Sequence, residues 1–147
     1  MIEVQNLTKR YGDLTAVSEV SFRVESGQIL GFLGPNGSGK TTTMRVITGF
    51  MPATAGTVKV AGFDIFDDSF EARKHIGYLP ESPPLYNDMT VTAYLRFVAR
   101  IKGMTRAAIP DALDRVLNRC GLTDVADRVT GYLSKGYRQR VGLAQAI

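Results

Sequence analysis

A glycine-rich run at residues 34–41, GPNGSGKT, constrains this chain of 147 residues more than any other feature. It matches the pattern GxxxxGK[ST] at every fixed position. The apolar run ILGFL comes directly before it, and a segment with helical character follows from Lys40 to Phe50. Glycines in such a turn let backbone N–H groups point inward around an anion, and the helix adds the positive end of its dipole. The run therefore predicts a phosphate-binding loop between a buried strand and a helix.

Each residue type in the loop has an expected role. Lys40 is expected to reach the β and γ phosphates of a nucleotide, and the Thr41 hydroxyl is expected to ligate Mg²⁺. Thr42 lies next to them as a further phosphate contact. The remaining loop residues are expected to surround the phosphates with backbone N–H groups, and they are Gly34, Pro35, Asn36, Gly37, Ser38 and Gly39.

Composition narrows the class of protein further. The chain is 44% apolar and carries a net charge of +4, but its Lys and Arg residues form no run of five or six. Direct nucleic-acid binding is therefore not expected, because the basic stripe that it needs is missing. Cys120 is the single cysteine, so no intrachain disulfide can form. We expect it to be a small core residue near the end of a helix. No window approaches the roughly 18 apolar residues of a membrane span, and we expect a soluble chain that meets a membrane only through a partner.

The N-terminal half has the pattern of strands. IEVQNL and VSFRV flank the turn-like RYGDL, and Thr57 to Val60 forms another short β-type run. ILGFL is apolar on successive residues, which predicts a strand covered on both faces. KHIGYLPE predicts a further short apolar strand, closed by Pro80.

From Thr90 onward the apolar residues recur at helical spacing. The first set is Val91, Tyr94, Leu95, Val98 and Ile101, and the second is Ile109, Leu113, Val116 and Leu117. Gly103 and Gly121 are placed where helices commonly end. We therefore expect a subdomain of about two to three helices after a strand-rich part.

Three further stretches occur along the chain, namely KRYGDLTAV, IGYLPESPPLYNDMTV and LSKGYRQRVGLAQAI. Together with the glycine-rich loop they resemble the ABC-transporter ATPase family. In that family an aromatic residue in the first stretch stacks on adenine, and Tyr11 matches it here; a tyrosine at this place can instead serve packing alone. Val17 falls where the family lines the adenine site.

The second stretch resembles the family's loop between the core and the helical subdomain. A glutamine in that loop usually ligates Mg²⁺ and senses the transmembrane partner, and Glu81 stands at its position here. A carboxylate is a hard oxygen donor that suits Mg²⁺, but it brings negative charge toward the γ-phosphate. Glu81 is thus either a Mg²⁺ ligand or an ordinary loop carboxylate.

The third stretch is similar to the family's LSGGQ signature. Ser134 and Gly136 match it, while Lys135 and Tyr137 depart from the usual glycine and glutamine. In the family this segment contacts the γ-phosphate bound to the opposite subunit, so that two sites form between two head-to-tail chains. Lys135 either strengthens the electrostatics there or is a solvated lysine.

The resemblance implies an α/β P-loop ATPase fold with an N-terminal antiparallel β subdomain and an inserted helical subdomain. The implied divisions are residues 1–85 for the β subdomain and the loop, 86–135 for the helical subdomain, and 136–147 for the signature helix. The implied catalytic residues are Lys40, Glu81 and Ser134, with ATP and Mg²⁺ as cofactors. LPE followed by LSKGYRQRVGLAQA resembles a subgroup paired with ABC-2 type permeases, which mostly export their substrates. That implies a homodimer or pseudo-dimer on a permease, at the cytoplasmic face of the cell membrane.

Family members continue past the signature helix into an apolar strand that ends in Asp-Glu, and no segment before Ile147 has that pattern. We therefore expect the C-terminal part of the core to be missing and turnover by this chain alone to be absent. The alternative function is a regulatory module that binds ATP without hydrolysis. A small P-loop kinase is disfavoured, because such kinases have no use for LSKGYRQR.

Overall fold

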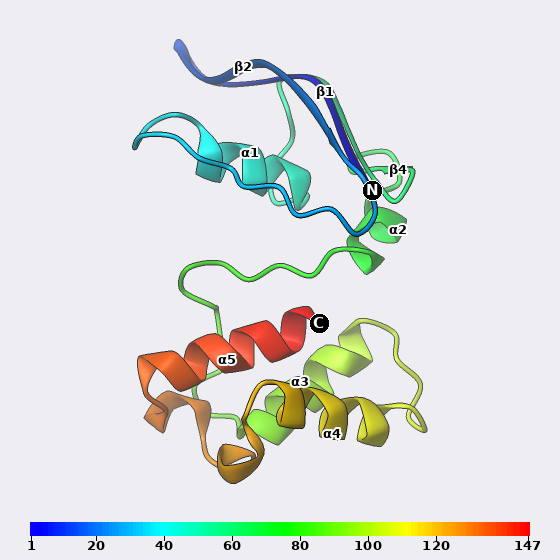
Figure 1. Ribbon diagram of the computed structural model, residues 1–147, viewed down its shortest axis with the longest axis vertical. Coiled ribbons are helices and arrows are strands. Elements are labelled where there is room, and N and C mark those ends of the chain that lie inside the picture. Colours follow the sequence, from blue (N-terminus) through cyan, green and yellow to red (C-terminus); the bar gives the residue numbers. More distant parts are fainter. The chain divides into compact units, whose positions relative to one another are not determined.

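An antiparallel sheet forms most of the N-terminal part of the computed structural model, which describes residues 1–147. Its strands are β1 (Ile2–Tyr11), β2 (Leu14–Val24), β3 (Ala55–Val60) and β4 (Phe63–Asp64), in the order β2-β1-β3-β4. Gly12, with φ +56°, makes the tight turn between β1 and β2. The antiparallel β subdomain expected from the sequence is confirmed (Figure 1).

Helix α1 (Lys40–Ile47) supplies the other half of the first core. Val46 and Ile47 are buried, and they share a cluster with Val4 and Leu7 of β1 and with other buried residues of the sheet. Figure 1 shows α1 lying beside the β1–β2 hairpin. The short α2 (Ser69–Lys74) follows β4 and closes the first of two compact units, Met1–Ile76. Because α1 is packed on the sheet, its first residue, Lys40, has a fixed position.

The expected strand ILGFL does not form. Residues 28–35 are in no helix or strand, and Ile29 and Leu33 are 97% and 93% exposed. The expected strand in KHIGYLPE is also wrong, since residues 76–80 are irregular. A strand requires a neighbour to pair its backbone N–H and C=O groups. No strand of this chain pairs with either segment, so the apolar pattern alone is not sufficient.

The exposed side chains of Ile29 and Leu33 should bind hydrophobic dyes. We expect the double variant Ile29→Thr, Leu33→Thr to bind less anilinonaphthalene sulfonate than the wild type, because both side chains face solvent. Its free energy of unfolding should change by less than about 0.5 kcal/mol, as for other surface substitutions. The matched control is Ile65→Thr at a buried position, which should lower the free energy of unfolding instead. Unchanged dye fluorescence in the double variant would contradict the exposure of these two side chains.

The second compact unit, Gly77–Ile147, is helical. It contains α3 (Val91–Ile101), α4 (Ile109–Arg119) and α5 (Lys135–Ala146). Two short 3₁₀ turns, Thr123–Val125 and Thr130–Tyr132, connect α4 to α5. The helical subdomain expected from the apolar spacing is confirmed. None of the helices combines the length and the apolar character that crossing a membrane requires.

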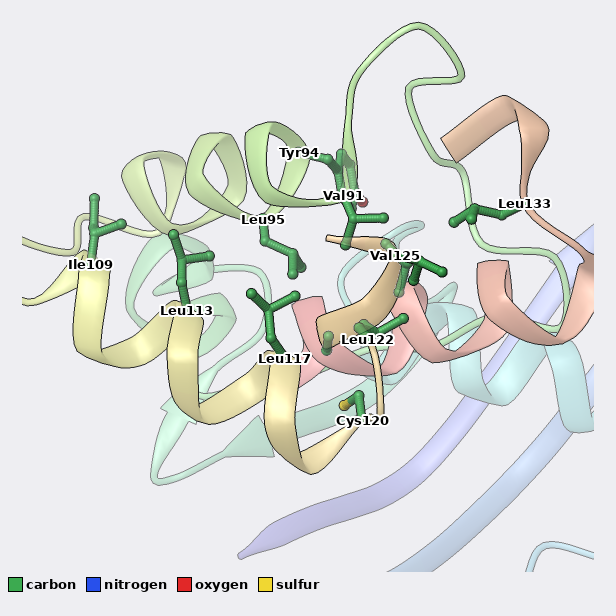
Figure 2. Close-up of a cluster of buried hydrophobic side chains, with 12 residues drawn as sticks. Val91, Tyr94, Leu95, Ile109, Leu113, Leu117, Cys120, Leu122, Val125 and Leu133 are labelled. Carbon is green, nitrogen blue, oxygen red and sulfur yellow. The ribbon is translucent and has the colours of Figure 1, made fainter. Parts of the chain in front are cut away.

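Figure 2 shows the core of this unit. Leu95 of α3 lies opposite Leu113 and Leu117 of α4, and Leu122 in the following turn is fully buried. Cys120 is buried at the end of α4, and this burial raises the pKa of its thiol. The prediction of a core cysteine is confirmed.

The two helix ends that were predicted at glycines are also confirmed. Gly103 and Gly121 follow the last residues of α3 and α4 with φ values of +80° and +61°. This left-handed conformation is the usual way to end a helix, and glycine adopts it without steric cost.

Candidate phosphate-binding site

The glycine-rich loop leads directly into α1. Gly37 and Gly39 have φ values of +84° and +85°, and Ser38 N donates to Pro35 O at 3.2 Å. Helix α1 begins at Lys40 with no side chain capping it and no acidic residue in its first turn. The first N–H groups of a helix have no carbonyl partner within it, and here no side chain caps them, so an anion can accept from them.

Lys40 spans the loop. Its Nζ donates to the carbonyl oxygens of Gly34 and Pro35 at 2.6 and 2.7 Å, and to Ser38 Oγ at 3.4 Å. The ammonium group is thus held within the loop by backbone acceptors. Phosphate oxygens are stronger acceptors for an ammonium group than neutral carbonyls are, so an arriving phosphate can replace some of these contacts.

A pocket of about 390 Å³ joins this loop to the end of the β1–β2 hairpin. Its lining consists of Tyr11, Leu14, Thr15, Ala16, Asn36, Gly37, Ser38, Gly39, Lys40, Thr41 and Thr42. Lys40 is the only charged residue among them, so the pocket favours an anionic ligand. Tyr11 lies at the wall, where an aromatic ring is available to a ligand that also contacts the loop.

The structure places Val17 differently from its neighbours. Its side chain is 5% exposed and belongs to the first core, whereas Thr15 and Ala16 line the pocket. The β1–β2 pairing is irregular here, because Lys9 pairs with Val17 and Arg10 with Thr15, which leaves Ala16 as an extra residue in β2. The bulge interrupts the alternation of faces, so the adjacent residues Thr15 and Ala16 both line the pocket while Val17 faces the core. Leu14, Thr15 and Ala16 also line the pocket, but nothing in their residue types predicts this role.

Ser134 begins α5 in the second unit. Its Oγ accepts from Tyr137 N at 3.4 Å, which makes Ser134 the N-cap of α5. Ser134, Lys135 and Gly136 are all exposed. Arg138 Nη1 donates to Leu133 O at 2.9 Å, a hydrogen bond between α5 and the residue before its N-cap. The signature segment therefore presents a serine hydroxyl and the start of a helix to solvent.

Helix α5 also holds the segment that contains Glu81. Gln139 Nε2 donates to the backbone carbonyl of Glu81, and Gln145 Nε2 donates to Tyr78 O at 2.8 Å. Between them Gly142 lies so close to the segment that an added Cβ would be 2.7 Å from both Leu79 and Pro83. Gln139 and Gln145 thus connect the Glu81 loop to the signature helix, and no motif in the sequence marks either residue.

A hollow of about 1070 Å³ lies between the Glu81 loop and the loop before α5. It is lined by Ser82, Pro83, Pro84, Leu85, Asn87, Asp88, Val129, Gly131, Tyr132 and Arg138. Tyr132 is 90% exposed, which is unusual for an aromatic side chain without a ligand or partner.

The structure therefore brings Tyr11 and the loop residues together around one pocket in the first unit. In the second unit Glu81 accepts from Gln139 of α5, and Ser134 caps the start of the same helix. Thr41 belongs to the first unit and Glu81 to the second. A Mg²⁺ site shared by these two side chains stays a prediction.

A glycine-rich loop that leads into a helix, with a lysine across it, defines a protein of the P-loop nucleotide-binding class. The sequence model of the family described as ABC transporter matches residues 17–147. The chain therefore belongs to the ABC transporter family, in which it corresponds to the ATP-binding domain.

Individual relatives agree with this membership. A probable multidrug ABC transporter ATP-binding protein of Escherichia coli, YbhF, is 38% identical over 98% of the chain. The bacitracin transport ATP-binding protein BcrA of Bacillus licheniformis is 35% identical over 100% of the chain. The chain spans only 25% and 47% of these two proteins.

Solved structures give the same result for the fold. An ATP-binding subunit of an ABC transporter matches 99% of the chain with a TM-score of 0.91 and 29% identity, and the chain covers 61% of it. The dimeric bacterial ABC transporter cassette MJ0796 matches 100% of the chain with a TM-score of 0.88 and 25% identity, and the chain covers 69% of it. The α/β fold of ABC ATPases expected from the sequence is confirmed.

Proposed function

We propose that this chain is part of an ATP-binding subunit of an ABC transporter, which binds Mg²⁺-ATP at the Gly34–Thr41 loop and hydrolyses it as a dimer to drive export. The observation that carries this proposal is the pocket that joins the Tyr11 ring to the glycine-rich loop and Lys40. A ring for the base and a cationic loop for the phosphates, within one pocket, match the two ends of ATP.

In this proposal the loop residues position the triphosphate. Backbone N–H groups of the loop and of the first turn of α1 donate to its oxygens, and Lys40 neutralises charge at the β and γ phosphates. Thr41 lines the pocket and its hydroxyl is a hard oxygen donor, so it fits Mg²⁺ as a ligand. Glu81 is the second proposed ligand. When bound, Mg²⁺ supplies charge neutralisation at the transferring phosphate.

The second half of the site is proposed to come from another chain. Ser134 and Gly136 of the partner subunit would contact the γ-phosphate through a hydroxyl and the N-terminal end of α5. The dimeric state of the cassette MJ0796 supports this arrangement. Within the chain, residues 1–85, 86–135 and 136–147 would act as the nucleotide-binding part, the helical part and the signature helix.

We place the permease contact at the hollow beside the Glu81 loop. Its exposed Tyr132 and its prolines offer apolar surface next to the segment that α5 holds through Gln139. An ABC-2 type permease that works as an exporter is the proposed partner, supported by relatives named for multidrug and bacitracin transport. The subunit would then lie at the cytoplasmic face of the membrane.

Measurements of binding and of turnover test this function. We expect the chain to bind ATP saturably in the presence of Mg²⁺, by calorimetry. The whole subunit, reconstituted with its permease, should release phosphate from ATP. The pocket lining itself includes no Asp or Glu that could polarise a water molecule, so the 147-residue chain should not release phosphate on its own. Binding without phosphate release by the reconstituted complex would favour the regulatory module instead.

A further inference from the structure

The Tyr11 ring is held in place from two sides. Its hydroxyl donates to Met51 Sδ at 3.0 Å. The Lys9 ammonium lies 5.3 Å from the centre of the ring, within the range of a cation–π interaction. Lys9 Nζ also donates to Pro52 O at 2.8 Å, so the same short segment positions both groups around the ring.

This segment, residues 50–54, is itself attached to β1. Thr54 N donates to Thr8 O at 2.8 Å, and Arg10 N donates to Thr54 Oγ1 at 3.0 Å. The Met51 side chain packs against the first core. The sulfur that accepts from Tyr11 is therefore part of a fixed structure and not the end of a mobile side chain.

Tyr11 nevertheless contributes little to the core. Its side chain is 45% exposed, and it lines the pocket together with the glycine-rich loop. An aromatic ring has two faces, and Lys9 covers one of them. An arrangement that fixes the ring, covers one face and leaves the rest open to a pocket suits stacking with a planar ligand. Fixing the ring beforehand also lowers the entropy that binding must offset.

We propose that Lys9 and Met51 are positioning residues that hold the Tyr11 ring for stacking with the nucleotide base. This inference rests on the proposed ATP site and adds two residues to it. Neither residue lines the pocket, so both act through Tyr11. Substitution of Lys9 or Met51 should therefore weaken binding of the base and leave binding of the phosphates unchanged.

Binding of two ligands separates these effects. Mg²⁺-ATP contains base and phosphates, whereas inorganic tripolyphosphate contains the phosphates alone. We expect Tyr11→Ala to weaken ATP binding roughly tenfold or more, since a base-stacking contact is lost. Lys9→Met and Met51→Leu keep the side-chain volume but remove the cation or the sulfur, and each should weaken ATP binding about two- to fivefold. None of the three should change tripolyphosphate binding.

Matched controls are Lys59→Met and Met44→Leu, which change exposed residues of the same unit outside the pocket. Both should bind ATP as the wild type does. Equal weakening of ATP and tripolyphosphate by Lys9→Met and Met51→Leu would overturn the inference, as would unchanged ATP binding. A wild type that bound tripolyphosphate but showed no extra affinity for ATP would also overturn it. A wild type that bound neither ligand would overturn the proposed function itself.

Discussion

Lys40→Ala is expected to lower the affinity for Mg²⁺-ATP by about tenfold to a hundredfold, the value of a hydrogen bond to a charged group. The lost ammonium is the only charge that lines the pocket, and it spans the loop through contacts to Gly34 and Pro35. Calorimetric titration of the variant and the wild type measures the loss. In the whole subunit the same change should abolish hydrolysis, because the charge on the transferring phosphate is no longer neutralised.

The control for this variant is Lys59→Ala, which removes an exposed lysine of β3 in the same unit. It changes the net charge equally, so it reports the nonspecific electrostatic part of the effect. ATP affinities within twofold of each other for Lys40→Ala and Lys59→Ala would contradict the role given to Lys40.

The second large effect is expected from Gly39→Ala. An added Cβ at Gly39 would lie 2.5 Å from Ala16 O and 3.0 Å from Val17 Cγ2, and φ is +85°. Either the start of α1 or the adjoining part of β2 must then move, and both line the pocket. We expect ATP binding to be lost and the free energy of unfolding to fall by more than about 2 kcal/mol, from strain and overpacking together.

Gly37→Ala is a matched control in the same loop. Gly37 has nearly the same φ, +84°, but an added Cβ would meet nothing within 4 Å. Gly37→Ala should lower the free energy of unfolding by only about 1–2 kcal/mol, the strain of a left-handed alanine. Thermal unfolding and ATP titration of both variants measure the difference. Equal losses in the two variants would show that close approach to Ala16 is not important.

The local signals in the sequence were sufficient for much of the fold. Gly12, Gly103 and Gly121 mark a turn and two helix ends because the left-handed conformation favours glycine whatever the tertiary context. The apolar spacing of Val91, Tyr94 and Leu95 is a property of one helix face, and these residues are buried in α3. Features that depend on a single element were therefore predictable.

Features that depend on the pairing of one strand with another were not predictable from the sequence. The run ILGFL has the pattern of a buried strand, but it pairs with no strand in this chain, and Ile29 remains exposed. An apolar pattern reports what a segment can bury and not whether a neighbour is there. The residue types of β2 do not reveal which of its residues face the pocket. Val17 was expected to line the adenine site, but Thr15 and Ala16 line the pocket instead.

The same distinction applies to the candidate site. The loop from Gly34 to Thr41 could be read directly, because its residue types and spacing are fixed by the anion that they surround. The contacts of Met51 with Tyr11, and of Gln139 with the Glu81 loop, join segments far apart in the sequence. A methionine and a glutamine carry no signal of such roles, so only the folded structure reveals them.

The most direct test of the proposed ATP site is a titration of the ¹³C,¹⁵N-labelled chain with Mg²⁺-ATP, followed by two-dimensional NMR of its amide and aromatic groups. We expect the largest shifts at the amides of Gly37, Gly39, Lys40 and Thr41, together with shifts of the Tyr11 ring protons, and saturation with a single affinity. The buried Leu122 of the second unit should be unaffected. Shifts absent from the loop, or spread without saturation over exposed lysines such as Lys59, would contradict an ATP site at this loop.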